Sequence, residues 1–110
     1  MDDAASAVEL ERAEQARAAG LEGRARVCAR RAAGWAIRAY YQRRAGAEAA
    51  GWGGDALAQL KRLSADADVP DGPRQAARRL TTVVDFAHEL PFAEDPLADA
   101  RSLVEFASRL

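Results

Sequence analysis

The sequence has too few histidine and cysteine residues to form a metal site from these ligands alone. Cys28 is the only cysteine and His88 is the only histidine. A single cysteine excludes an internal disulfide and fits a reducing compartment. The Glu-x-x-His pairs that di-iron bundles use are also missing from the sequence. We therefore expect no metal and no other cofactor.

Long apolar runs are also missing. The longest uninterrupted apolar stretches have three or four residues, whereas a helix needs about 20 to span a membrane. The chain starts with Asp2 and Asp3 rather than with the basic segment and apolar run of a secretory signal. These features predict a protein of the cytoplasm, in a cell of bacterial type.

Aromatic residues are scarce, at 6% of a 110-residue chain, and alanine supplies much of its 49% hydrophobic fraction. This length fits one domain, residues 1–110. An alanine-rich core buries little area per residue but lets helices approach closely. Because a second copy would add buried surface to such a thin core, we expect a homodimer.

The apolar residues follow helical spacing, and no segment alternates as a strand does. The pattern predicts an all-α, antiparallel up-and-down bundle of four to five helices. The expected helices span residues 3–19, 24–45, 56–66, 73–89 and 96–110. We expect Gly20 to end the first helix, and Asp55 and Asp95 to cap the third and fifth. Val8 and Leu57 are expected to face the core.

The second expected helix is apolar around most of its circumference. We therefore expect other helices or a second subunit to cover most of it. Gly34 lies in its interior, where glycine costs about 1 kcal/mol relative to alanine. A close approach of another backbone explains a glycine at this position.

Charge is distributed unevenly, although the net charge is −1. Residues 1–22 and 85–110 each carry a net charge of −4, whereas residues 23–47 carry seven arginines and no acid. Arg24, Arg31 and Arg38 follow each other at intervals of seven, so they share one helix face with Trp35 nearby. We call these four residues the arginine stripe.

The arginine stripe has two interpretations. Guanidinium groups bind phosphates well, and a tryptophan among them can stack on a base. Alternatively, the acidic neighbouring helices pair with these arginines and hold the bundle in register. The sequence leaves both interpretations open.

His88 and Cys28 are the remaining candidates for chemistry. Asp85 lies three residues before His88 and is placed to orient it as a general base. Nothing nearby supplies a nucleophile, and a capping or packing role near a helix end is the alternative. Cys28 lies among alanines, where it is expected to act as a small hydrophobe. We therefore assign no catalytic residue and lean towards a protein that is not an enzyme.

The segment from Gly23 to Ile37 resembles the second helix of HEPN-superfamily domains. The layout after it is similar too, with a leucine helix, a proline-interrupted arm and an acidic final helix. These features lie at Ala56–Leu60, Val69–Leu80 and Asp99–Phe106. The resemblance implies a helical bundle that is often dimeric. Members of the superfamily include ribonucleases of toxin and defence systems, partners of small nucleotidyltransferases, and inactive binding or scaffold versions.

The ribonuclease members carry an arginine, four to six further residues, and then a histidine in a late helix. Here eight residues separate Arg79 from His88, and nine separate Arg78 from it. We therefore do not carry the nuclease site over. The hypothesis is a non-catalytic HEPN-like binding or assembly module that binds a nucleotide or RNA through Arg24, Arg31, Arg38 and Trp35. The alternatives are a structural protein-interaction module, such as the antitoxin-like partner of a nucleotidyltransferase, and a ribonuclease that uses His88.

Overall fold

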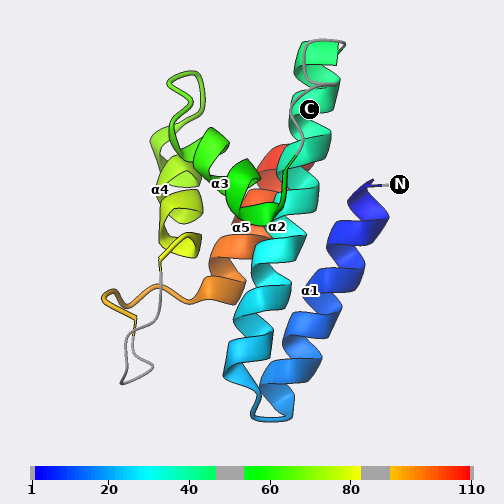
Figure 1. Ribbon diagram of the computed structural model, residues 1–110, viewed down its shortest axis with the longest axis vertical. Coiled ribbons are helices and arrows are strands. Elements are labelled where there is room, and N and C mark those ends of the chain that lie inside the picture. Colours follow the sequence, from blue (N-terminus) through cyan, green and yellow to red (C-terminus); the bar gives the residue numbers. More distant parts are fainter. Residues whose placement is uncertain (1, 47–53, 83–89, 110) are drawn as a thin grey trace.

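The computed structural model describes residues 2–46, 54–82 and 90–109, which form helices packed against one another (Figure 1). The helices in these ranges are α1 (Asp2–Ala18), α2 (Glu22–Ala45), α3 (Ala56–Ser64), α4 (Asp71–Leu80) and α5 (Pro96–Ser108). The described ranges contain no strand. The prediction of an all-α helical bundle is confirmed. None of these helices is both long and apolar enough to cross a membrane.

Helix α2 is the centre of the bundle, because it packs against α1, α3 and α5. Helices α1 and α2 run side by side as a long antiparallel hairpin (Figure 1). Helix α5 packs mainly against α2 and α4, and α3 and α4 pack against each other. The side of α2 that these neighbours leave open is therefore available for other contacts.

The turn between α1 and α2 is a Schellman motif. Gly20 has a positive φ of 78°, which an L-residue with a side chain rarely adopts. The Leu21 N–H donates to the Ala16 carbonyl at 2.8 Å, and the Gly20 N–H donates to the Arg17 carbonyl at 2.9 Å. These two bonds satisfy the last carbonyls of α1. The expected end of the first helix at Gly20 is confirmed.

Two aspartates cap helix starts as expected. The Asp55 carboxylate accepts a hydrogen bond from the Ala58 N–H at 3.0 Å at the start of α3. The Asp95 carboxylate accepts one from the Leu97 N–H at 3.3 Å at the start of α5. Each bond satisfies an N–H that has no partner inside the helix.

Gly34 is a point of close backbone approach between α2 and α3. A Cβ atom at Gly34 would lie 2.8 Å from both the Cα and the Cβ of Ala56. Only glycine lets the first turn of α3 come this close to α2. The predicted close backbone approach at Gly34 is confirmed.

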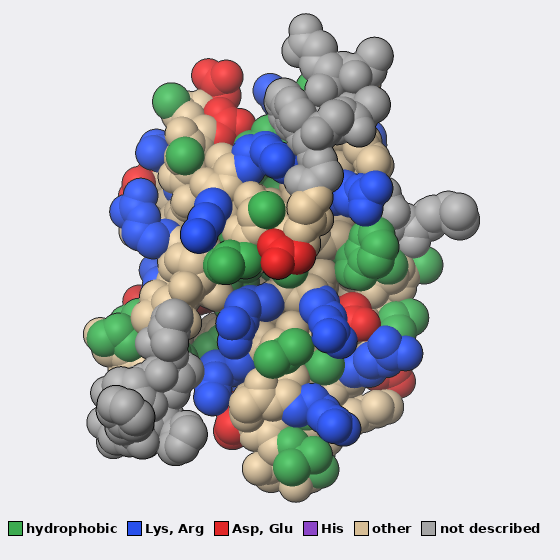
Figure 2. Space-filling model, in the orientation of Figure 1, with side chains coloured by type: hydrophobic (Ala, Val, Ile, Leu, Met, Phe, Trp, Pro, Cys, Tyr) green, Lys and Arg blue, Asp and Glu red, His purple; other side chains and the backbone are tan. Residues whose placement is uncertain are grey.

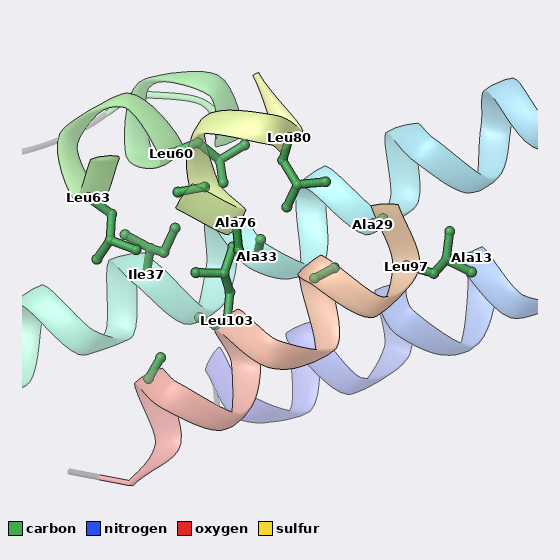
Figure 3. Packing of buried hydrophobic residues seen from close by; sticks show 14 of the residues in the cluster. Ala13, Ala29, Ala33, Ile37, Leu60, Leu63, Ala76, Leu80, Leu97 and Leu103 are labelled. Carbon is green, nitrogen blue, oxygen red and sulfur yellow. The ribbon is translucent and has the colours of Figure 1, made fainter. Parts of the chain in front are cut away.

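The core divides into a seam of small residues and a cluster of larger ones (Figure 3). Alanines fill the contact between α1 and α2, and the Ser6 hydroxyl donates there to the Ala32 carbonyl at 3.1 Å. The larger buried side chains come from α2, α3, α4 and α5. They are Ile37, Tyr40, Tyr41, Leu60, Leu63, Leu80, Leu97 and Leu103.

Three expectations about the helices are wrong. Val8 and Leu57 are 45% and 39% exposed, because α1 turns Ser6, Glu9 and the alanines inward and α3 turns Leu60 and Leu63 inward. The helix expected over residues 73–89 begins at Asp71 and ends at Leu80. Residues 83–89 of that expected helix, with Asp85 and His88, lie outside the described residues.

Candidate functional site

All four residues of the arginine stripe are exposed on the outer face of α2. Trp35 is 38% exposed, and the side chains of Arg24, Arg31 and Arg38 also face solvent. Because α2 is continuous through this segment, successive arginines are about 10 Å apart along its axis. Figure 2 shows Lys and Arg side chains gathered on this side of the molecule, with hydrophobic side chains between them.

The stripe has no acidic partner within the described part of the chain. No ion pair or hydrogen bond there involves the guanidinium of Arg24 or Arg31. The Arg38 guanidinium lies 5.8 Å from the centroid of the Trp35 ring, which is within cation–π range. The positive charges of the stripe therefore face water rather than carboxylates of the same fold.

The acidic residues pair with other arginines instead. Arg17 donates from both terminal nitrogens to the Asp95 carboxylate at 2.7 and 2.8 Å, and from Nε to Glu22 at 2.8 Å. These hydrogen bonds lower the pKa of Asp95 and the pKa of Glu22 below their usual ranges. Arg17 thereby joins the start of α5 to the α1–α2 hairpin.

Arg79 makes the second such link. It donates from Nε and Nη2 to the two oxygens of Asp99, at 2.9 and 2.8 Å, and so ties α4 to α5. Asp99 is only 6% exposed. The hydrogen bonds between Arg79 and Asp99 raise the pKa of the Arg79 guanidinium. The ion-pair interpretation thus describes Arg17 and Arg79, whereas the stripe arginines are exposed and form no ion pair with a described carboxylate.

A small cleft opens beside Trp35, where the Gly34–Ala56 contact holds the start of α3 against α2. We call it the tryptophan cleft. Its volume is about 230 Å³, and it is lined by Arg31, Gly34, Trp35, Arg38, Gly54, Asp55, Ala56 and Gln59. One oxygen of Asp55 caps α3 at this edge.

A second cleft lies along the α1–α2 hairpin, and we call it the hairpin cleft. Its volume is about 660 Å³, and it is lined by Arg12, Gln15, Ala16, Ala19, Leu21, Arg24, Val27, Cys28 and Arg31. Leu21 and Val27 are 48% and 41% exposed, whereas Cys28 is buried as expected. Arg31 lines both clefts and stands at their boundary.

Sequence reasoning missed the residues that α1 and α3 contribute. Arg12 and Gln15 reach the hairpin cleft, and Asp55 and Gln59 reach the tryptophan cleft. Asp55 was expected as a cap only. The spacing within one helix predicts which residues share a face, but it does not predict which neighbouring helix lies beside that face.

Within the described ranges, no group of three or more histidine, cysteine or acidic residues is placed to hold a metal ion. His88 and Asp85 lie outside those ranges. A search with this sequence finds no matching family model, no similar curated protein and no similar solved structure. The resemblance to HEPN-superfamily domains therefore stays a prediction.

Proposed function

We propose that this protein is a non-catalytic, HEPN-like binding module of the cytoplasm that binds RNA or a nucleotide through the arginine stripe. The observation that carries the proposal is the exposure of Arg24, Arg31 and Arg38 on one face of α2, with no carboxylate partner in the described part of the chain. Isolated arginines at a surface are common, but a straight row of three beside an exposed tryptophan suits a phosphate backbone.

Phosphate binding follows from the chemistry of the guanidinium group. Arginine stays protonated at all physiological pH values, and its planar fork matches two phosphate oxygens. Because each contact to a phosphate releases condensed counterions, such binding weakens steeply as the salt concentration rises. Four of the carboxylates, those of Glu22, Asp95, Glu94 and Asp99, pair with Arg17 and Arg79 rather than with the stripe.

The test is the fluorescence anisotropy of a labelled single-stranded RNA, titrated with the protein at low and at physiological salt. Replacing Arg31 with alanine should lower the slope of log affinity against log salt by about 0.7, the value for one lost phosphate contact on a single strand. Arg78→Ala is the matched control, because Arg78 is exposed on α4, away from the stripe. Absence of binding at low salt contradicts the proposal.

The hairpin cleft favours a second candidate function, a protein-interaction module such as the antitoxin-like partner of a nucleotidyltransferase. Leu21 and Val27 are exposed in this cleft, and Arg12, Arg24 and Arg31 line it with them. An apolar surface among cations suits an acidic amphipathic helix, which has leucines on one face and carboxylates beside them. Val27→Ser would weaken the binding of such a helix by removing apolar contact area, while the RNA salt slope stays unchanged because serine adds no charge beside Arg24 and Arg31.

The same exposed apolar side chains support the expected homodimer. Pairing two copies through Leu21 and Val27 would remove from water the side chains that are 48% and 41% exposed in one chain. Sedimentation equilibrium of the protein and of Val27→Asp tests this arrangement. A monomer at all concentrations contradicts it, and so does a dimer that Val27→Asp leaves intact.

A further inference from the structure

The tryptophan cleft is suited to one flat ring rather than to a whole cofactor. Its volume of about 230 Å³ is below the roughly 300–1,000 Å³ of pockets that enclose drug-sized ligands. Its lining comes from α2 and from the first residues of α3, two elements that the Gly34–Ala56 contact holds together. The cleft therefore presents a fixed shape to a small group at the end of the stripe.

Trp35 supplies the flat surface. Trp35 is 38% exposed, and the Arg38 guanidinium lies 5.8 Å from the centroid of its ring. Base-to-aromatic stacking contributes substantially to single-strand binding and accepts any base. A cation beside the ring also interacts favourably with nearby phosphates. Stacking alone therefore predicts a preference for unpaired bases but not for one base over another.

The polar groups of the tryptophan cleft can distinguish one base from another. Asp55 uses one carboxylate oxygen for the Ala58 N–H at 3.0 Å, and a carboxylate has about four acceptor positions. Its remaining acceptors are open to solvent and can accept from donors on a ligand. Arg31 and Arg38, in contrast, can only donate, and so require acceptors. The matching base has a pair of donors on one edge and a pair of acceptors on another.

We propose that the tryptophan cleft binds one unpaired guanine base of RNA, an inference that rests on the RNA-binding function proposed above. Guanine alone among the four RNA bases has adjacent N–H donors at N1 and N2 together with the acceptors O6 and N7. The donor pair faces Asp55, the acceptor pair faces an arginine of the stripe, and the ring stacks on Trp35. In a duplex the N1 and N2 donors are already paired and the ring is covered, so the guanine has to be unpaired.

The experiment uses the full chain with Trp52→Phe, which leaves Trp35 as the only tryptophan. Three labelled RNA strands of equal length are compared: a uridine homopolymer and the same strand with one central guanosine or one central adenosine. Anisotropy reports binding, and the intrinsic fluorescence reports stacking on Trp35. We expect the guanosine strand to bind about tenfold more tightly than the homopolymer and to quench Trp35. The adenosine strand should show a smaller increase in affinity over the homopolymer.

Asp55→Asn is the decisive variant, because asparagine still caps the helix but replaces one acceptor oxygen with a donor. It should remove the advantage of guanosine over adenosine, which is measured as the ratio of the two affinities within the same variant. Asp68→Asn is the control, since Asp68 is exposed and does not line the cleft.

The outcomes separate the two proposals. Equal binding of guanosine and adenosine strands overturns the guanine assignment, as does a guanosine preference that survives in Asp55→Asn. In both cases a steep salt dependence that Arg31→Ala reduces would keep the RNA-binding proposal intact. If no strand binds at low salt, both proposals fail together.

Discussion

Two groups of arginines in this protein have similar side chains and different surroundings. Arg17 and Arg79 donate in pairs to Asp95 and Asp99 and thereby join α1 to α5 and α4 to α5. Arg24, Arg31 and Arg38 lie on a single helix and face water. The difference shows that a basic segment beside acidic helices does not have to be neutralised by them. The position of an arginine on its helix decides whether it forms an ion pair, because only side chains that point at a neighbouring helix can reach its carboxylates.

Removing Arg79 should have the largest effect on stability. Arg79→Ala leaves the carboxylate of Asp99, which is 6% exposed, without its two hydrogen bonds. Losing one partner of a nearly buried ion pair costs about 3 kcal/mol of unfolding free energy. Urea denaturation measures the loss. Arg78→Ala on the same helix should cost less than about 0.5 kcal/mol, as exposed sites usually do. A small effect of Arg79→Ala would remove the distinction between the two groups.

Gly34→Ala tests whether the inner and outer sides of α2 are independent. The added methyl group would lie 2.8 Å from the Cα of Ala56, so α3 has to shift. Overpacking of this kind costs about 2 kcal/mol. The salt dependence of RNA binding should stay that of the wild type, because the stripe arginines are unchanged, whereas the preference for guanosine should fall, because Gly34 and Ala56 line the tryptophan cleft. A lower thermal midpoint with an altered salt slope would mean that the two sides are coupled.

The Arg17–Asp95 pair should make a smaller contribution that depends on pH. The pKa of Asp95 is lowered in the folded state, mainly by the hydrogen bonds from Arg17. The pair therefore stabilises the fold above the unfolded-state pKa of about 3.9, and this stabilisation is lost as pH falls through the lower folded-state pKa. Asp95→Asn keeps a helix cap but removes the charge.

Thermal melts between neutral and acidic pH compare Asp95→Asn with the wild type. The difference in melting temperature should be present at neutral pH and shrink below about pH 4. In an Arg17→Ala background the same substitution should give a difference that varies little with pH. A constant difference in both backgrounds would show that Arg17 does not act on Asp95 through charge.

The smallest effect on stability is expected at the stripe. Arg31→Ala removes a side chain that has no ion pair with a described carboxylate. The unfolding free energy should therefore change by less than about 0.5 kcal/mol, while binding to RNA weakens. If Arg31→Ala destabilised the protein as strongly as Arg79→Ala, the stripe would belong to the structural group.

Much of the fold follows from local signals in the sequence. Gly20, Asp55 and Asp95 act within one or two helical turns of their own positions, so the sequence predicts their roles. The close backbone approach at Gly34 was predicted because glycine destabilises the interior of a helix, and a close contact explains its presence there. Val8 and Leu57 were placed wrongly, because an apolar side chain does not reveal whether its helix face meets a neighbour. The clefts were not predicted, since they arise where α1 and α3 meet α2.

The alanine seam between α1 and α2 has a consequence for how the stripe can respond to a ligand. Alanine has no side-chain rotamers to change, so buried alanines of α1 and α2 such as Ala13 and Ala29 cannot adapt by rotating side chains. Any adjustment has to slide one whole helix along the other. The intervals between the three arginines are fixed by the helical backbone. The long arginine side chains therefore make the adjustment to the phosphate spacing of a ligand, while the backbone positions that carry them stay fixed along α2.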